Sequence, residues 1–309
     1  MEFYKPSGAC PLNAVLLLLA TGIPLTLLGG VVYAFGIVYI PLVYVSVLLT
    51  LGYSWLLGTT VGWVAMKGRL RNNRLLTVFG LLMGGMGLYT AWAWDAVARL
   101  GTEVGLLGFH PFFLWAYLNF LYENGSWSLD GGAALTGPAL AAVWLTEAIL
   151  VLAISVFVGR SWTANLAYCE KCQLWHEVKQ GLLHLASDAD APVWQRVEEG
   201  DLGALDQLPF GVDSQGRAIR LDLSLCPECE ETGYLTAQAV TYTVDEKGAV
   251  SEQARPLFAH AAIARETAAW LCEKACQAAA EAMAAEAAVE EAMAAEAALE
   301  GQDHEATAG

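Results

Sequence analysis

Charged residues are almost missing from the first half of this chain. No Asp, Glu, Lys or Arg occurs in the 53 positions from Ala14 to Met66. At about 1.5 Å per residue, a helix of that length is twice what is needed to cross the roughly 30 Å hydrocarbon core of a bilayer. The mean hydropathy of +0.44 is also too high for an ordinary soluble protein. The lipid bilayer is therefore the first partner that the sequence indicates.

Basic residues are far fewer than acidic residues in the second half of the chain. Residues 1–160 contain seven of the 16 Lys and Arg and six of the 32 Asp and Glu. Residues 161–309 contain the other nine Lys and Arg and the other 26 Asp and Glu. Binding to nucleic acid depends on Lys and Arg that neutralise phosphates, so we expect no nucleic-acid partner. The change in charge also indicates a domain boundary near residue 160.

Motifs of membrane-embedded enzymes are absent too. The chain has no HExxH and no GxSxG, and no His lies in the spans predicted below, which argues against a haem held in the bilayer. The sequence therefore favours a protein that is not an enzyme.

Four transmembrane helices are predicted. The first two form a hairpin whose turn falls near Phe35, Gly36 and Pro41, where Gly and Pro interrupt the apolar run. The spacing Gly58-xxx-Gly62 in the second helix and the spacing Gly80-xxx-Gly84 in the third predict close helix packing. The predicted spans are residues 14–34, 42–66, 75–94 and 138–159.

The orientation follows from a short basic loop after the second span. Loops of this kind stay on the cytoplasmic side of a membrane. We therefore expect a protein of the inner cell membrane with both termini in the cytoplasm, including a short N-terminal segment over residues 1–13. The basic residues of the loop are Lys67, Arg69, Arg71 and Arg74.

Residues 105–122 form a fifth apolar segment, which is interrupted by His110 and Pro111. We expect an interfacial or re-entrant segment on the outer side. The alternative is a fifth span, which would place residues 161–309 outside. Arg160 would then be external, and the distribution of positive charge argues against that arrangement.

Glu147 is the one ionisable residue well inside a predicted span. Such residues mark transport pathways in some membrane proteins, and in others they hold helices together through Thr, Tyr or Trp side chains. Both interpretations stay open for Glu147. Asp95 and Arg99, one helical turn apart, are expected to form a surface ion pair.

Two CxxC pairs follow the last span, Cys169 with Cys172 and Cys226 with Cys229. In a reducing cytoplasm four such thiolates typically form a tetrahedral structural Zn²⁺ site. The interval of 53 residues between the pairs requires an insertion, and Gln173 and Glu230 stand where a Gly often allows positive φ. Either pair alone could instead be a thiol redox pair.

The remaining pattern predicts a small α+β domain that resembles a zinc ribbon, over residues 161–260. Alternating apolar residues predict a strand over 219–225, a second over 234–244 and a third over 249–255 after a turn at 245–248. Apolar residues between 193 and 208 predict short helices that cover the sheet. His176 and His184 are expected to be ordinary packing or surface residues.

An Ala- and Glu-rich helix is predicted over residues 261–300, followed by a disordered tail over 301–309. Cys272 and Cys276 lie on one face of this helix and are interpreted as ordinary thiols. The fold class is thus a four-helix transmembrane bundle, then a zinc-ribbon-like domain, then a C-terminal helix.

Three functions fit this architecture. The first is a membrane-anchored adaptor or regulatory protein that presents the zinc domain to a protein partner. The second is a transport or channel component that uses Glu147. The third is a membrane thiol-disulfide oxidoreductase, which the acidic surroundings of the cysteines disfavour because they destabilise a thiolate.

Overall fold

A computed structural model describes residues 1–40, 42–126, 134–188, 191–229, 231, 233–245 and 248–306. The chain divides into two compact units. One is Pro6–Asn165, and the other combines Met1–Lys5 with Leu166–Gly309. Each unit is described by itself below.

The first unit contains four helices that are long and apolar enough to cross a membrane, which agrees with the predicted number. Each is longer than its predicted span. The first connection lies at residues 40–42, and Pro41 is outside the described residues. The helices are α1 (Leu12–Tyr39), α2 (Val43–Gly68), α3 (Asn73–Leu100) and α6 (Gly137–Ser161).

Local sequence explains where the basic loop begins and ends. Arg69 adopts a left-handed conformation, with φ of 56°, and so terminates α2. Asn72 is the N-cap of α3, because its side chain accepts hydrogen bonds from the backbone N–H groups of Arg74 and Leu75. The connection between the two helices is therefore only four residues long.

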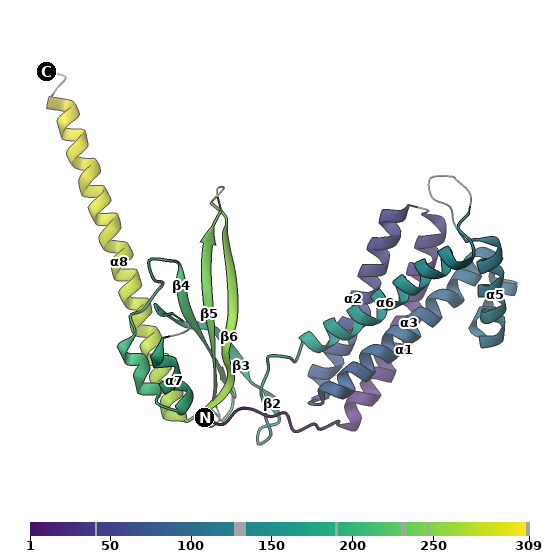
Figure 1. The fold of residues 1–309 in the computed structure, drawn as a ribbon, viewed down its shortest axis with the longest axis horizontal. Helices are drawn as coiled ribbons and strands as arrows, with labels where there is room; N and C mark the ends of the chain where they lie inside the picture. Colours follow the sequence, from purple (N-terminus) through teal and green to yellow (C-terminus); the bar gives the residue numbers. More distant parts are fainter. Residues whose placement is uncertain are drawn as a thin grey trace. The chain divides into compact units, whose positions relative to one another are not determined.

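In the helical unit α6 lies against α2 and α3 (Figure 1). Small residues let these helices pack closely. A Cβ added at Gly58 would lie 3.0 Å from the backbone oxygen of Ser155. One added at Gly80 would lie 2.8 Å from the Cα of Val156. The close packing predicted from the two glycine spacings is confirmed, and α6 is the helix that both approach.

The segment after α3 turns sharply. It consists of α4 (Thr102–Gly105), a 3-10 helix η1 (Leu106–Phe109) and α5 (Pro111–Asn124), with a bend of 111° at His110. This geometry fits either a broken span or a re-entrant segment.

Asp95 anchors this segment to α3. Its carboxylate is buried, pairs with Arg99 Nε at 3.1 Å and accepts a hydrogen bond of 2.6 Å from the hydroxyl of Tyr117 in α5. The predicted ion pair is therefore confirmed, but the prediction that it lies at the surface was wrong because Asp95 is buried. The sequence shows the spacing of Asp95 and Arg99, but it does not show that α5 covers the carboxylate.

The second unit is built on a four-stranded antiparallel sheet in the order β3-β4-β5-β6. Its strands are β3 (Glu177–Leu185), β4 (Arg217–Leu225), β5 (Gly233–Val244) and β6 (Val250–Ile263). The three predicted strands correspond to β4, β5 and β6, whereas β3 was not predicted. Residues 246 and 247 of the predicted turn lie outside the described residues.

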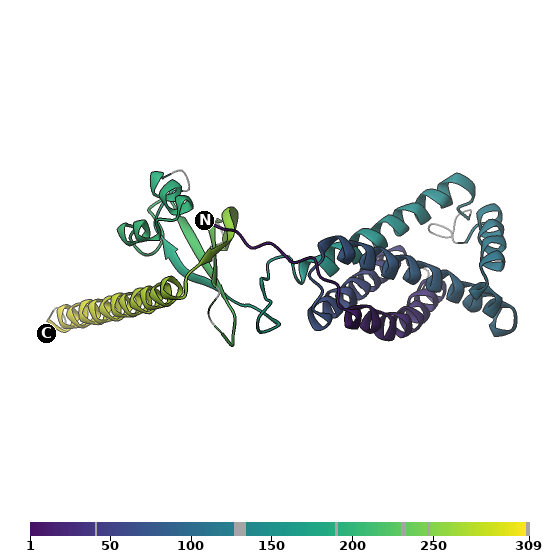
Figure 2. The same ribbon diagram turned by 90° about the horizontal axis from the view of Figure 1, so that it is seen from below.

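The C-terminal helix differs from the prediction at both ends. Residues 261–263 belong to β6, and α8 runs from Arg265 to Ala306. The helix thus continues into the segment predicted to be disordered, of which residues 307–309 are not described. The last turns of α8 extend beyond the sheet (Figure 2).

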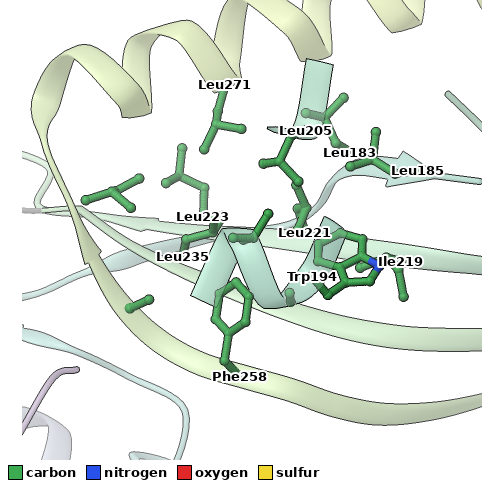
Figure 3. Close-up of a cluster of buried hydrophobic side chains, with 14 of the residues drawn as sticks. Leu183, Leu185, Trp194, Leu205, Ile219, Leu221, Leu223, Leu235, Phe258 and Leu271 are labelled. Atoms are coloured by element: carbon green, nitrogen blue, oxygen red, sulfur yellow. The ribbon is translucent and has the colours of Figure 1, made fainter. Parts of the chain in front are cut away.

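Helices cover one face of the sheet and complete its core. α7 (Pro192–Glu199) contributes Trp194, a 3-10 helix η2 (Leu202–Gln207) contributes Leu205, and α8 contributes Leu271. These side chains meet buried residues of the strands such as Leu221 and Phe258 (Figure 3). The predicted helical cover over residues 193–208 is confirmed.

The first five residues, the N-terminal strap (Met1–Lys5), belong to this second unit. The backbone N–H of Tyr4 donates a hydrogen bond to the backbone oxygen of His260 at 2.9 Å, and the backbone N–H of Ala262 donates one to the backbone oxygen of Glu2 at 2.7 Å. The Tyr4 ring packs edge-on against Tyr234, with centroids 5.2 Å apart. The strap thus extends the sheet beside the end of β6.

Candidate metal centre

The first cysteine pair lies in a small hairpin. β1 (Tyr168–Cys169) pairs with β2 (Leu174–Trp175), and Cys172 lies in the turn between them. Gln173 adopts φ of 55°, the conformation for which a Gly was expected. The turn therefore forms without glycine. Glu230, the equivalent residue after the second pair, is outside the described residues.

The second pair lies in the connection between β4 and β5. β4 ends at Leu225, which pairs with Gly233, so Cys226 and Cys229 form the loop of this hairpin. Leu225 also pairs with Glu177, the first residue of β3. Because only His176 separates β2 from β3, this pairing brings the two cysteine turns together across the 53-residue interval.

The four thiols lie close enough to hold one metal ion. Their sulfur atoms are all within 4.8 Å of one another, and those of Cys169 and Cys229 are 3.8 Å apart. A tetrahedral ion with metal–sulfur bonds of about 2.3 Å requires sulfurs about 3.8 Å apart. All seven cysteines of the chain are free thiols. The donor set and its dimensions therefore fit a tetrahedral metal ion.

The four thiols influence one another's protonation. Hydrogen bonding with Cys229 and loss of solvation raise the pKa of Cys172 to about 12. Burial acts to raise the pKa of Cys226, but hydrogen bonds from the backbone N–H groups of Cys229 and Glu228 and with the thiols of Cys229 and Cys169 together lower that pKa to about 7. Crowded thiols hold protons between them, and a divalent cation would displace those protons and stabilise four thiolates.

An exposed ion pair joins the two cysteine turns. Lys171, between the first two cysteines, approaches Glu231 to 2.7 Å. The hydrogen bond between them raises the pKa of Lys171 and lowers that of Glu231. Both side chains are more than half exposed, so the pair adds little stability. It offsets one of the acidic residues that surround the thiols.

The two histidines and the remaining cysteines lie outside the four-thiol group. His176 is buried, its ring packs on Tyr234 with centroids 5.3 Å apart, and burial lowers its pKa. His184 lies beside Tyr242. Cys272 is within 4.0 Å of the Lys179 amine, and Cys276 is exposed.

Glu147 lies in the other unit, on α6. The hydroxyl of Tyr33 in α1 donates a hydrogen bond to its Oε1 atom, and the Tyr33 oxygen is 3.0 Å from Oγ1 of Thr50 in α2. Tyr33 also stacks on Tyr53, with centroids 5.1 Å apart. One polar network thus joins three of the four long helices.

Comparisons with protein-family models, with curated proteins and with solved structures found no match.

Proposed function

We propose that this chain is a non-enzymatic membrane adaptor that anchors a zinc-bearing α+β domain at the cytoplasmic face of the cell membrane and presents it to a protein partner. The observation that carries the proposal is the closed four-cysteine group. Four protein ligands complete a tetrahedral coordination sphere and leave no position for water or substrate, which is typical of structural rather than catalytic zinc.

Zinc is the metal that best fits the ligands and their place in the fold. Four thiolates in a tetrahedron suit Zn²⁺ or a single iron, and hard cations such as Mg²⁺ prefer oxygen. The two cysteine turns lie at the ends of hairpins that meet through Glu177 and Leu225. A bound ion would cross-link the start of the domain to the middle of its sheet.

The N-terminal strap supports the orientation. Since the strap and residues 166–309 form one compact unit, the chain must leave this unit and return to it on one side of the membrane. An even number of crossings satisfies this requirement, which favours four spans and a re-entrant segment over residues 102–124. The basic loop at residues 67–74 then indicates that this side is the cytoplasm.

The edge of the sheet offers a surface for a protein partner. The seven residues Val250–Pro256 of β6 are all exposed. Within the described residues, β6 pairs with β5 on one side and with the strap only near its far end, at residues 260–262. An extended segment of a partner can add to such an edge through backbone hydrogen bonds.

The metal is tested on the full-length protein, purified in detergent without added metal. We expect about one zinc per chain in the wild type and in Cys276→Ser, an exposed thiol outside the group, and none in Cys226→Ser. Stoichiometric iron would overturn the zinc assignment. A Cys169–Cys172 or Cys226–Cys229 disulfide in protein isolated with its thiols blocked would overturn both the metal and the cytoplasmic orientation.

The partner surface is tested by photo-crosslinking in cells. A crosslinking amino acid at Gln253 in β6 should give a discrete adduct that is missing when the probe is placed at Glu281, an exposed position on α8. The adduct should be lost in Cys226→Ser and kept in Glu147→Gln. If Glu147→Gln removes it and Cys226→Ser does not, the adaptor proposal is wrong.

A further inference from the structure

A cavity of about 600 Å³ lies among α1, α2 and α6 of the helical unit. It occupies the half of the bundle away from the basic loop, because its walls come from the end of α1, the start of α2 and the first half of α6. Arg99 and Ser126 also contribute to its lining. Its volume falls in the range of sites for small organic ligands.

One part of the cavity lining is polar. Glu147, Tyr33 and Thr50 all line it, and the hydroxyl of Tyr33 joins the other two. Glu147 lies ten residues after the start of α6, which is about 15 Å along the helix. Most other walls are aliphatic, including Ile37, Val47 and Leu150. The site therefore offers a largely apolar volume with a carboxyl group in its wall.

Glu147 is the acidic group of this cavity that lacks a counter-ion. Within the described part of the chain, its one hydrogen-bond donor is the neutral Tyr33, and no basic side chain pairs with it. Arg99 is already neutralised, because its Nε lies 3.1 and 3.2 Å from the two carboxylate oxygens of Asp95. Its Nη1 donates to the backbone oxygen of Ser126 at 3.0 Å.

These observations identify the chemistry of an occupant. A carboxylate in apolar surroundings is stabilised by a cation that enters with it, and anions are repelled. A bare metal cation would need six or more oxygen ligands, which an aliphatic wall does not supply. We propose that the cavity binds a small organic ammonium ion, with the cationic group at Glu147 and an apolar body against the aliphatic walls.

The depth of Glu147 favours a free amine over a lipid. The ammonium of a lipid headgroup lies at the membrane surface, whereas Glu147 is about 15 Å along α6 from its outer end. A free ammonium ion with a short apolar body can reach that depth.

The test measures binding of radiolabelled hexyltrimethylammonium to the full chain in nanodiscs made of phosphatidylglycerol, with empty nanodiscs subtracted. We expect saturable binding that Glu147→Gln weakens by at least about 30-fold, because the variant keeps the shape of the side chain and loses its charge. The matched control is Glu103→Gln, an exposed acidic residue of α4 outside the cavity, which should bind within about twofold of the wild type.

A second variant tests the cavity without changing its charge. Val47→Trp places a large ring at a half-exposed wall position, so it should abolish binding while the melting temperature stays near that of the wild type. Unlabelled hexanol and hexanesulfonate should compete poorly with the probe.

Three results would overturn the proposal. They are wild-type affinity in Glu147→Gln, competition by hexanol equal to that by the ammonium ion, and loss of probe binding when phosphatidylethanolamine is added to the nanodiscs. The last result would make a lipid headgroup the occupant.

Discussion

The contact between α3 and α6 can be tested with a pair of one-methyl substitutions. Gly80→Ala would place a new Cβ 2.8 Å from the Cα of Val156 and 2.8 Å from its Cγ2. Carbon atoms in good contact are about 3.5–4.0 Å apart, so the two helices would have to separate by about 1 Å. Gly85→Ala lies on the same helix with nothing within 4 Å of its Cβ, and it is the matched control.

The two substitutions have one effect in common and one that separates them. Both replace Gly by Ala within a helix, which stabilises by about 0.5–1 kcal/mol. Only Gly80→Ala adds an overpacking cost of about 1–3 kcal/mol. We therefore expect Gly85→Ala to unfold at or above the wild-type temperature and Gly80→Ala to be less stable than Gly85→Ala by about 1–3 kcal/mol.

The assay is thermal unfolding of the full chain in detergent, followed by the loss of the monodisperse peak in size-exclusion chromatography. Equal melting temperatures for the two variants would show that α6 does not approach the backbone of α3 at Gly80. A destabilised Gly85→Ala would show that the exposed side of α3 is wrongly assigned.

Three further predictions are measured by thermal unfolding, by limited proteolysis and by unfolding as a function of pH. Tyr117→Phe leaves the buried carboxylate of Asp95 without its 2.6 Å hydrogen bond and should cost about 1–3 kcal/mol, whereas Tyr122→Phe, on the same helix, should be neutral. Tyr4→Ala removes the ring contact with Tyr234 and should make the strap more sensitive to proteolysis than Phe3→Ala does, since Phe3 is 48% exposed. The pKa of Asp213 is lowered from its ordinary value of 3.8, first by the backbone N–H of Arg217 and then by that of Gln215 and by the Arg217 guanidinium. The contribution of the Asp213 carboxylate to the free energy of unfolding is therefore complete above pH 3.8 and is lost as the pH falls through the lower folded-state pKa. Asp213→Asn should therefore lose less stability on acidification than the wild type. An unchanged dependence of stability on acid pH would contradict this prediction.

Much of the local structure could be predicted from residue order alone. A run of 53 residues without charge predicts apolar helices long enough to cross a bilayer, and the structure has two such helices there. The alternation of apolar and charged residues before Cys226 identified β4, and the spacing of the cysteines identified the four candidate ligands. In each of these cases the property that decides the structure is carried by neighbouring residues.

The strand β3 was missed for a local reason. Its apolar pattern is broken where Gly181 takes φ of 62° and the pairing with β4 shifts between Lys179 and Leu183. The backbone N–H of Gly181 is bound by the carboxylate of Asp222 at 2.7 Å, a partner 41 residues away. A bulge of this kind hides the period of two by which strands are recognised.

Contacts between distant segments were decided by the tertiary structure alone. The convergence of the two cysteine turns depends on the pairing of Glu177 with Leu225, and the position of the strap depends on backbone hydrogen bonds that involve no distinctive side chains. The link from Tyr33 to Glu147 joins residues 114 positions apart. The sequence determines which residues prefer lipid, strand or metal, but which of them meet is set by packing and register, because many distant pairs have the same chemistry and only the fold brings particular ones within reach.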